Sequence, residues 1–223
     1  MPHLRRLWLP IFSVFWLAAD PAAAQEIGKL YETRPPAGSA FIRTALIGGL
    51  NRGAKVEIST TDFSVAGNDI ASRYRALRID QPVSLSINGR GLGQITLMSD
   101  KFYTLVIGGD DEHWQHFVMD EGQGSVNDLK AELRFFNLIP HCDASLRIAG
   151  GPTIFDVAEF VSVKSRTINP VQAQLEASCN GRGATFRLPQ LRPGDHYSLF
   201  FREVANQPDL TGQLDETEPY RDR

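Results

Sequence analysis

Asn88-Gly89-Arg90-Gly91 recurs 92 positions later as Asn180-Gly181-Arg182-Gly183, and β-rich runs flank both copies. Asn-Gly between two such runs is typical of a type I′ hairpin, because both central residues of that turn need positive φ. The sequence therefore predicts two similar hairpins, with Arg90 and Arg182 at their tips.

The similarity extends outward from the hairpins, in the same order in both halves of the chain. The matching stretches are 79–83 with 168–171, 100–105 with 194–199, and 40–43 with 131–134. Ordered self-similarity at a nearly fixed spacing indicates a duplicated structural unit. We therefore expect two tandem domains of one fold.

Strand-like runs dominate both halves, and turn residues separate them about every 8–12 residues, as in sandwiches and small barrels. Alternating or β-rich residues predict strands over 41–47, 54–58, 83–87, 102–107, 161–163, 184–188 and 196–201. The run 102–107 is expected to be buried on both faces or central in its sheet. Only 69–78 suggests a helix. The predicted fold class is all-β: two tandem small β-sandwiches, Ig-like or jelly-roll-like, joined by a short linker.

Composition places the boundaries of these domains. The stretch 120–128 is Gly-rich and polar, and the chain after Ala205 has few apolar residues. The predicted organisation is a signal peptide (1–24), a first sandwich (25–121), a linker (122–128), a second sandwich (129–205) and a flexible polar tail (206–223).

The first 24 residues have the pattern of a secretory signal peptide. Arg5-Arg6 precedes an apolar run over 7–19, and Ala22-Ala23-Ala24 ends the segment. The run is about 13 residues long, whereas about 20 are needed to span a bilayer. We expect cleavage after Ala24 and a periplasmic protein that does not insert in the membrane.

Charge and cysteine content narrow the function further. Loss of residues 1–24 removes Arg5, Arg6 and Asp20, which changes the formal net charge from −3 to −4. So mild and mixed a charge does not predict nucleic-acid binding. Cys142 and Cys179 are the two cysteines. In an oxidising compartment such a pair predicts a disulfide, although a nucleophilic thiol beside His141 is an alternative.

Two patterns around His113 offer candidate chemistry. Asp111-Glu112-His113-Trp114 resembles the Asp-x-His-Trp motif of SGNH-like acetyltransferases, but neither a serine motif nor alternating β and α segments accompany it. His113 and His116, with the acidic residues 110–112, offer metal ligands, yet residues three apart on a strand point to opposite faces. The sequence therefore predicts no catalytic site, metal or cofactor.

Several stretches resemble the AlgF family of periplasmic proteins in alginate O-acetylation. They are Leu30-Tyr31, Pro35-Pro36-Ala37-Gly38-Ser39-Ala40-Phe41-Ile42-Arg43, Tyr103-Thr104-Leu105-Val106, and Leu133-Arg134 with Asn137-Leu138. The resemblance covers nearly the whole chain to Phe201. The Cys142/Cys179 pair departs from the alginate members, and AlgF-like proteins also occur in clusters for acetylated cellulose.

This resemblance implies two small β-sandwiches without catalytic machinery that act as an adaptor. The implied partners are periplasmic SGNH-like O-acetyltransferases and a membrane-bound O-acyltransferase, with weak or no binding of polysaccharide. Two alternatives stay open: a carbohydrate-binding module that contacts the polymer, and an acetyl-esterase or acetyltransferase that uses His113.

Four arginines are candidates for partner contact. Arg90 and Arg182 are expected at hairpin tips, where a planar cation can engage an acidic surface or a uronate carboxylate. Arg43 and Arg134 occupy equivalent places in the first strand of each unit and should point away from their sandwich cores. They are either structural or part of a docking face.

Overall fold

The computed structural model describes residues 37–47, 54–65, 69–79, 82–109, 113–124 and 129–220. These residues form sixteen β-strands, arranged in four sheets of four strands. The predicted all-β class of two tandem sandwiches is confirmed. The described residues contain no helix of the length and apolar character that a membrane crossing requires. The predicted signal peptide and most of the linker (125–128) lie outside them.

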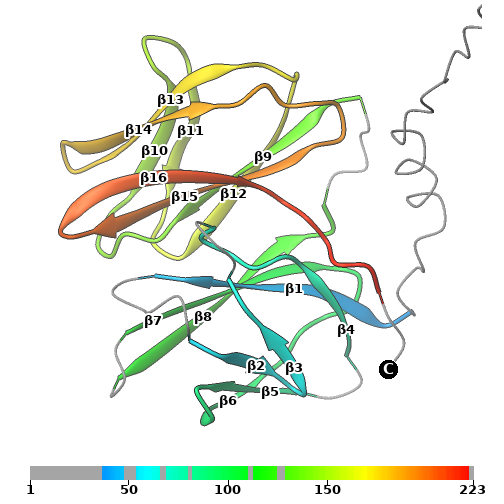
Figure 1. Cartoon of the computed structure of the whole chain (residues 1–223). Coiled ribbons are helices and arrows are strands. Elements are labelled where there is room, and N and C mark those ends of the chain that lie inside the picture. The colour runs from blue at the N-terminus through cyan, green and yellow to red at the C-terminus, as the bar shows by residue number, and fades with distance from the viewer. Residues whose placement is uncertain are drawn as a thin grey trace, which may run out of the picture. The chain divides into compact units, whose positions relative to one another are not determined.

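The first sandwich consists of an inner and an outer sheet (Figure 1). The inner sheet has the order β4 (Arg75–Arg78), β1 (Ser39–Leu46), β7 (Phe102–Gly109) and β8 (Trp114–Gly122). The outer sheet has the order β3 (Thr61–Phe63), β2 (Val56–Ile58), β5 (Val83–Ile87) and β6 (Arg90–Ile95).

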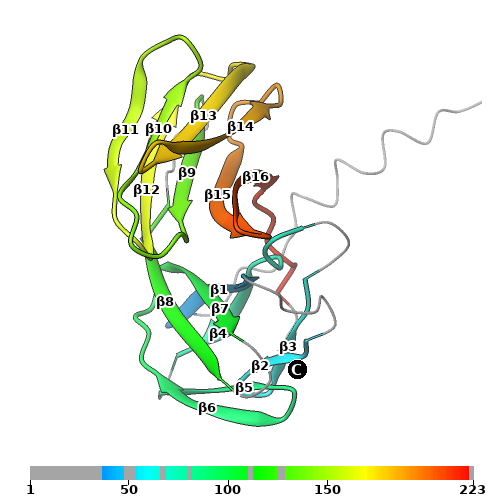
Figure 2. The ribbon, with the colours of Figure 1, turned by 90° about the vertical axis from the view of Figure 1, so that its left-hand side faces the viewer.

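The second sandwich repeats this arrangement (Figure 2). Its inner sheet has the order β12 (Ser162–Ile168), β9 (Ala131–Asn137), β15 (His196–Val204) and β16 (Gln207–Leu214). Its outer sheet has the order β11 (Thr153–Ala158), β10 (Ala144–Ile148), β13 (Ala173–Cys179) and β14 (Arg182–Leu188).

The strand orders of the two sandwiches match position by position. Strands β1 to β8 correspond in order to β9 to β16, and both inner sheets contain one parallel pair, β1 with β7 and β9 with β15. The duplication inferred from the short sequence matches is therefore visible in the topology.

The two Asn-Gly hairpins form as predicted. Asn88 and Gly89 have φ of 50° and 79°, and Asn180 and Gly181 have φ of 49° and 75°. Strand pairing closes directly around both turns, from Ile87 to Arg90 and from Cys179 to Arg182. Positive φ at both central residues is the geometry of a type I′ turn.

Apolar side chains form a core inside each sandwich and a third cluster between the inner sheets. On β1, Ile42 enters the first core, while Ala45 enters the third cluster with residues of both sandwiches. On β15, Leu199 enters the second core and Phe200 the third cluster. Because the inner sheets are covered on both sides, β7 is buried along nearly its whole length, as predicted for 102–107.

Two predictions made from the sequence are wrong. Within 69–78, where a helix was suggested, Arg75–Arg78 form the edge strand β4. The predicted flexible tail instead begins with β16, which pairs with β15 over eight residue pairs, so the second sandwich extends beyond residue 205. The two strands meet at Ala205-Asn206, whose φ values of 48° and 61° form a tight turn without the usual glycine.

The predicted disulfide is present and joins Cys142 to Cys179 across 37 positions. Cys142 is buried before β10, and Cys179 ends β13. Nearby, the fully buried Asn137 amide donates to the carbonyls of Cys142 and Ala158 at 2.6 and 2.8 Å. The crosslink therefore fixes a loop whose polar groups are already paired.

Replacing both Cys142 and Cys179 with alanine should lower the free energy of unfolding by about 3 kcal/mol, because the open chain regains the entropy of a closed loop. Urea denaturation of the oxidised protein, the reduced protein and the double variant measures this loss. An unchanged midpoint, together with two titratable thiols in unreduced protein, would contradict the assignment.

Candidate functional site

The two candidate arginines of the first strands occupy equivalent positions at the contact between the sandwiches. Arg43 lies opposite Thr104 in the β1–β7 register, and Arg134 lies opposite Ser198 in the β9–β15 register. Both point away from their own cores, as predicted. Both are nevertheless fully buried, because the face to which they point packs against the other sandwich. A docking role for Arg43 and Arg134 on an exposed face is therefore wrong.

Each sandwich also supplies at least one buried carboxylate. Glu121 lies in a β-bulge of β8: Phe102 pairs with Gly122 and Tyr103 with Asp120, which leaves Glu121 as the extra residue. A bulge can redirect a side chain in this way. In the second sandwich, Asp215 directly follows β16, and its backbone N–H donates to the His196 carbonyl at 2.8 Å. The side chains of Glu121 and Asp215 are 0% and 3% exposed.

The strongest ion pair of this cluster crosses between the sandwiches. Arg43 donates to Asp215 Oδ1 at 2.6 Å and to Ser198 Oγ at 2.8 Å, both in the second sandwich. Its Nε donates to Thr104 Oγ1 within its own sandwich at 2.7 Å. Ser198 in turn donates to Asp215 at 2.9 Å. With a longer contact of 3.4 Å to Glu121 Oε2, one guanidinium thus donates to four oxygens in two domains.

Arg134 and Glu121 add a second buried cation and a second buried carboxylate to these contacts. Arg134 donates to Asp215 Oδ2 at 3.1 Å and lies 3.5 Å from Glu121 Oε2. Glu121 accepts from Thr104 at 2.5 Å and from the Tyr74 hydroxyl at 2.7 Å. Two buried cations therefore face the carboxylates of Glu121 and Asp215, and a third buried carboxylate, Glu132, pairs with Arg134 at 3.4 Å. We call Arg43, Arg134, Glu121, Asp215, Thr104, Ser198 and Tyr74 the central cluster.

Aromatic rings cover this cluster. The Arg43 guanidinium lies 4.4 Å from the Tyr74 ring centroid, within cation–π range. Phe136 and Phe200 stack with centroids 4.8 Å apart in the apolar cluster between the sheets, and the Arg43 guanidinium lies 5.3 and 5.5 Å from their rings. Exclusion of water strengthens the ion pairs and makes loss of either partner costly.

Burial and neighbouring charges set the protonation states of the cluster. Burial acts to lower the pKa of Arg43, but Asp215 and Glu121 raise it by more, so it lies above its ordinary value. The pKa of Arg134 is raised in the same way, against the effect of burial. Burial raises the pKa of Tyr74 well above 10.0, with partial opposition from Arg43. The arginines are therefore charged and Tyr74 is neutral at physiological pH.

Two further contacts join the sandwiches beside the cluster. Gln213 of β16 accepts from the backbone N–H of Ile70 and Ala71 at 3.0 and 2.9 Å. The C-terminal segment 215–220 then leaves the second sandwich and runs along β4 of the first. Tyr74 donates its N–H to the Glu216 carbonyl and accepts from the Glu218 N–H, each at 2.8 Å. The end of the chain therefore bonds to the first sandwich.

The hairpin arginines, by contrast, lie at the surface as predicted. Arg90 and Arg182 are both exposed and follow the two type I′ turns. Arg182 donates to the Asn206 carbonyl at 2.5 Å and to Glu203 at 3.3 Å. The hairpins belong to the two outer sheets, which the two inner sheets separate. The structure therefore does not bring Arg90 and Arg182 together in one site.

The remaining candidates concern His113. It is exposed just before β8, and His116 is half-buried on that strand, while residues 110–112 lie outside the described residues. Trp114 to Met119 lie in β8, as the alternative to a catalytic motif predicted. Within the ranges that the structure describes, no three His, Cys, Asp or Glu side chains are grouped to hold a metal ion.

Comparison with known proteins adds little to this geometry. No protein-family model and no curated protein matches the sequence. One similar structure is CBMbc, a CBM26-family module of Eubacterium rectale Amy13K in complex with maltoheptaose, with 11% identity and a TM-score of 0.25 over 82% of this chain and 100% of that one. Another is a candidate cell adhesion protein from Bacteroides ovatus, with 11% identity and a TM-score of 0.27 over 84% and 100%. Similarities this weak carry no functional argument.

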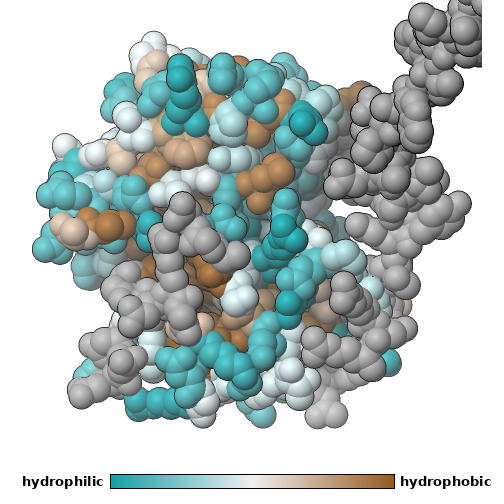
Figure 3. All heavy atoms as spheres, viewed as in Figure 1, coloured by the Kyte–Doolittle hydropathy of each residue, from teal (hydrophilic) through white to brown (hydrophobic). Residues whose placement is uncertain are grey.

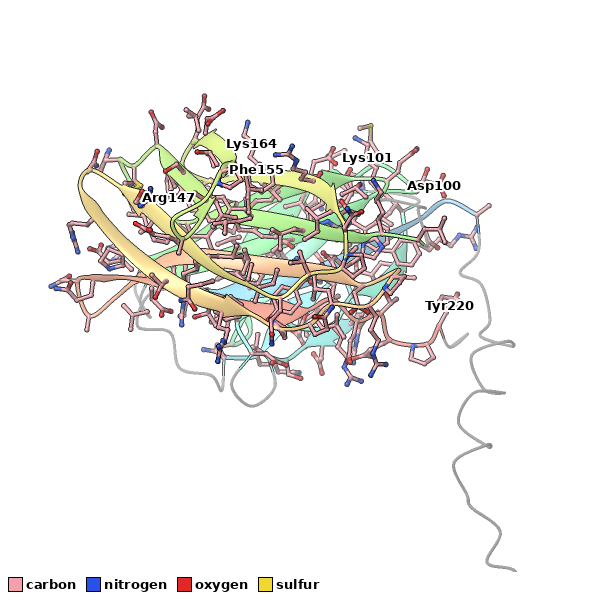
Figure 4. All side chains as sticks on the ribbon, turned by 90° about the horizontal axis from the view of Figure 1, so that it is seen from above. Asp100, Lys101, Arg147, Phe155, Lys164 and Tyr220 are labelled. Atoms are coloured by element: carbon pink, nitrogen blue, oxygen red, sulfur yellow. A yellow bond between two sulfur atoms is a disulfide. The ribbon has the colours of Figure 1, made fainter. Side chains whose placement is uncertain are left out.

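Substituting methionine for Arg43 should lower the free energy of unfolding by about 3–5 kcal/mol, because Asp215 and Glu121 would stay buried with a single cation. Arg147→Met is the matched control. Arg147 pairs with Glu176 at 2.8 Å on the surface, where ion pairs contribute about 0.2–1 kcal/mol (Figure 4). Urea denaturation of both variants measures these losses of stability. Equal losses in Arg43→Met and Arg147→Met would contradict a central role for Arg43.

Stability should also fall at alkaline pH. Burial raises the pKa of Tyr197 to about 12 and that of Tyr74 well above 10.0, so the folded protein holds both phenols neutral after they ionise in the unfolded chain. The contribution of Tyr197 is complete below pH 10 and is lost as pH rises through about 12. Tyr197→Phe should reduce the decline, measured by urea denaturation from pH 9 to 12. An unaltered decline in Tyr197→Phe would contradict this assignment.

Proposed function

We propose that this protein is a periplasmic, non-catalytic adaptor for the O-acetylation of an exopolysaccharide, alginate or cellulose. It holds an SGNH-like acetyltransferase near its acetyl donor, a membrane-bound O-acyltransferase. The proposal rests on the AlgF-like sequence stretches and on the export signal. The disulfide supports an oxidising compartment. The mechanism is positional, since bringing two reactants together raises their effective concentration without new chemistry.

The placement of the aromatic side chains favours an adaptor over a carbohydrate-binding module. Sugar platforms use exposed aromatic rings, but every described Phe, Tyr and Trp is buried or half-buried. Trp114 packs against the first core, and Phe117 and Phe160 pack edge to face. The surface in Figure 3 is mainly hydrophilic, with scattered hydrophobic patches. Such a surface suits polar, salt-sensitive contacts with a protein.

A binding comparison tests the proposal. The purified protein without residues 1–24 should bind a purified periplasmic SGNH-like O-acetyltransferase of the same organism, and binding should weaken as salt is raised from low to physiological concentration. Immobilised alginate and cellulose oligosaccharides should retain little of it. Strong retention on either glycan, with no binding of the acetyltransferase, would favour the carbohydrate-binding module instead.

An esterase assay addresses the catalytic alternative in the same preparation. The protein should not hydrolyse a chromogenic acetyl ester above the rate of a His113→Ala variant. Hydrolysis that His113→Ala abolishes would replace the adaptor proposal with an enzyme.

A further inference from the structure

The protein's own C-terminal segment pairs at the outer edge of the first inner sheet, at Tyr74 just before β4. An isolated parallel bridge joins Tyr74 to Thr217, so the segment acts as a short additional strand of the first inner sheet. Its acidic residues, Glu216 and Glu218, have the two-residue spacing of one strand face. They pair with Arg73 at 2.6 Å and with Arg75 at 2.7 Å. The segment thus combines strand pairing with charge complementarity.

The contacts that fix this segment become more exposed after its first residue, Asp215. Asp215 is buried in the central cluster, whereas the Arg73–Glu216 pair is 62% and 47% exposed. Glu216 and Glu218 each make one backbone hydrogen bond to Tyr74, the residue just before β4. Exposed ion pairs are weak and screened by salt. Glu218 pairs with Arg75 through two contacts, of 2.7 and 2.9 Å, and these side chains are 37% and 28% exposed. Glu216 and Glu218 are therefore held by more exposed contacts than Asp215 is.

The edge continues beyond the part that the segment pairs. Tyr74 presents its N–H and carbonyl outward, and by the two-residue period of a strand Ala76 and Arg78 face the same way. A hollow of about 530 Å³ lies here, lined by Arg73, by β4 (Arg75–Arg78), by Thr60 and Thr61, and by Glu218 to Tyr220. Figure 4 shows Tyr220 at the margin of the ribbon, away from Lys164 and Arg147.

We propose that the outer edge of β4 is a docking site for an extended acidic segment of a partner protein. The partner segment pairs as a strand parallel to β4, with carboxylates two positions apart on Arg73 and Arg75, and displaces residues 216–220. Exposed sheet edges bind extended peptides through main-chain hydrogen bonds, while side chains provide specificity. The C-terminal segment is then an internal competitor. This inference does not depend on the acetylation pathway.

A labelled peptide of residues 214–220 is a direct probe of the site. It should bind a variant that ends at Asp215, and fluorescence anisotropy should show binding at least about tenfold weaker to the full chain, as expected if the internal segment occupies the edge in about 90% of molecules. The same peptide with Glu216→Lys and Glu218→Lys should not bind. Truncated protein with Arg73→Glu and Arg75→Glu should reverse this preference.

Two further arms keep the proposal open to refutation. If the truncated protein does not fold, the full chain with Glu216→Lys and Glu218→Lys replaces it, since repulsion from Arg73 and Arg75 should free the edge for the native peptide. Failure of the peptide to bind folded protein with a free edge would overturn the proposal, as would binding unaffected by charge reversal. Binding of a uronate oligosaccharide in place of the peptide would also overturn it. So would a dimer of the full chain that truncation abolishes, since the occupant would then be a second copy.

Discussion

The central cluster is the constraint on which the rest of the structure depends. Two arginines that alternate away from their own cores must be buried against something, and the duplicated fold provides a second inner sheet with matching polar groups. Arg43 reaches across to Asp215 and Ser198, while Arg134 bonds Asp215 and lies close to Glu121. Removing one member of a buried ionic group leaves the other charges buried without a partner, which is costly. The cluster therefore joins the two sandwiches in one arrangement.

The sequence predicted the elements well where local signals are strong. The Asn-Gly turns fixed both hairpins, and alternation located most strands. The sequence-based predictions failed where pairing with distant segments of the chain determines the structure. Residues 206–223 are polar, but β15 offered β16 a complete row of backbone partners. Segment 69–78 lacks strong strand character, yet β4 pairs with β1, and Tyr74 just before β4 bridges to the C-terminal segment. Long-range pairing overrides weak local propensity in both cases.

The burial of Arg43 and Arg134 was also beyond local reasoning, because alternation gives the direction of a side chain but not what covers it. A signal did exist in the repeat. Thr104 and Ser198 are equivalent, and each hydrogen-bonds an acidic residue 17 positions later, Glu121 or Asp215. A hydroxyl and a carboxylate repeated at that interval beside a repeated arginine indicate a conserved polar arrangement within the duplication. Glu121 remained hidden because a β-bulge, not strand alternation, directs its side chain.

The most direct test of this account is a double-mutant cycle between Arg43 and Asp215, with Arg43→Met, Asp215→Asn and both changes together. Urea denaturation should give a coupling energy of at least about 1.5 kcal/mol, as expected for residues in one buried network. Additive losses, with coupling within about 0.5 kcal/mol of zero, would contradict the claim that a shared ionic cluster holds the two sandwiches together.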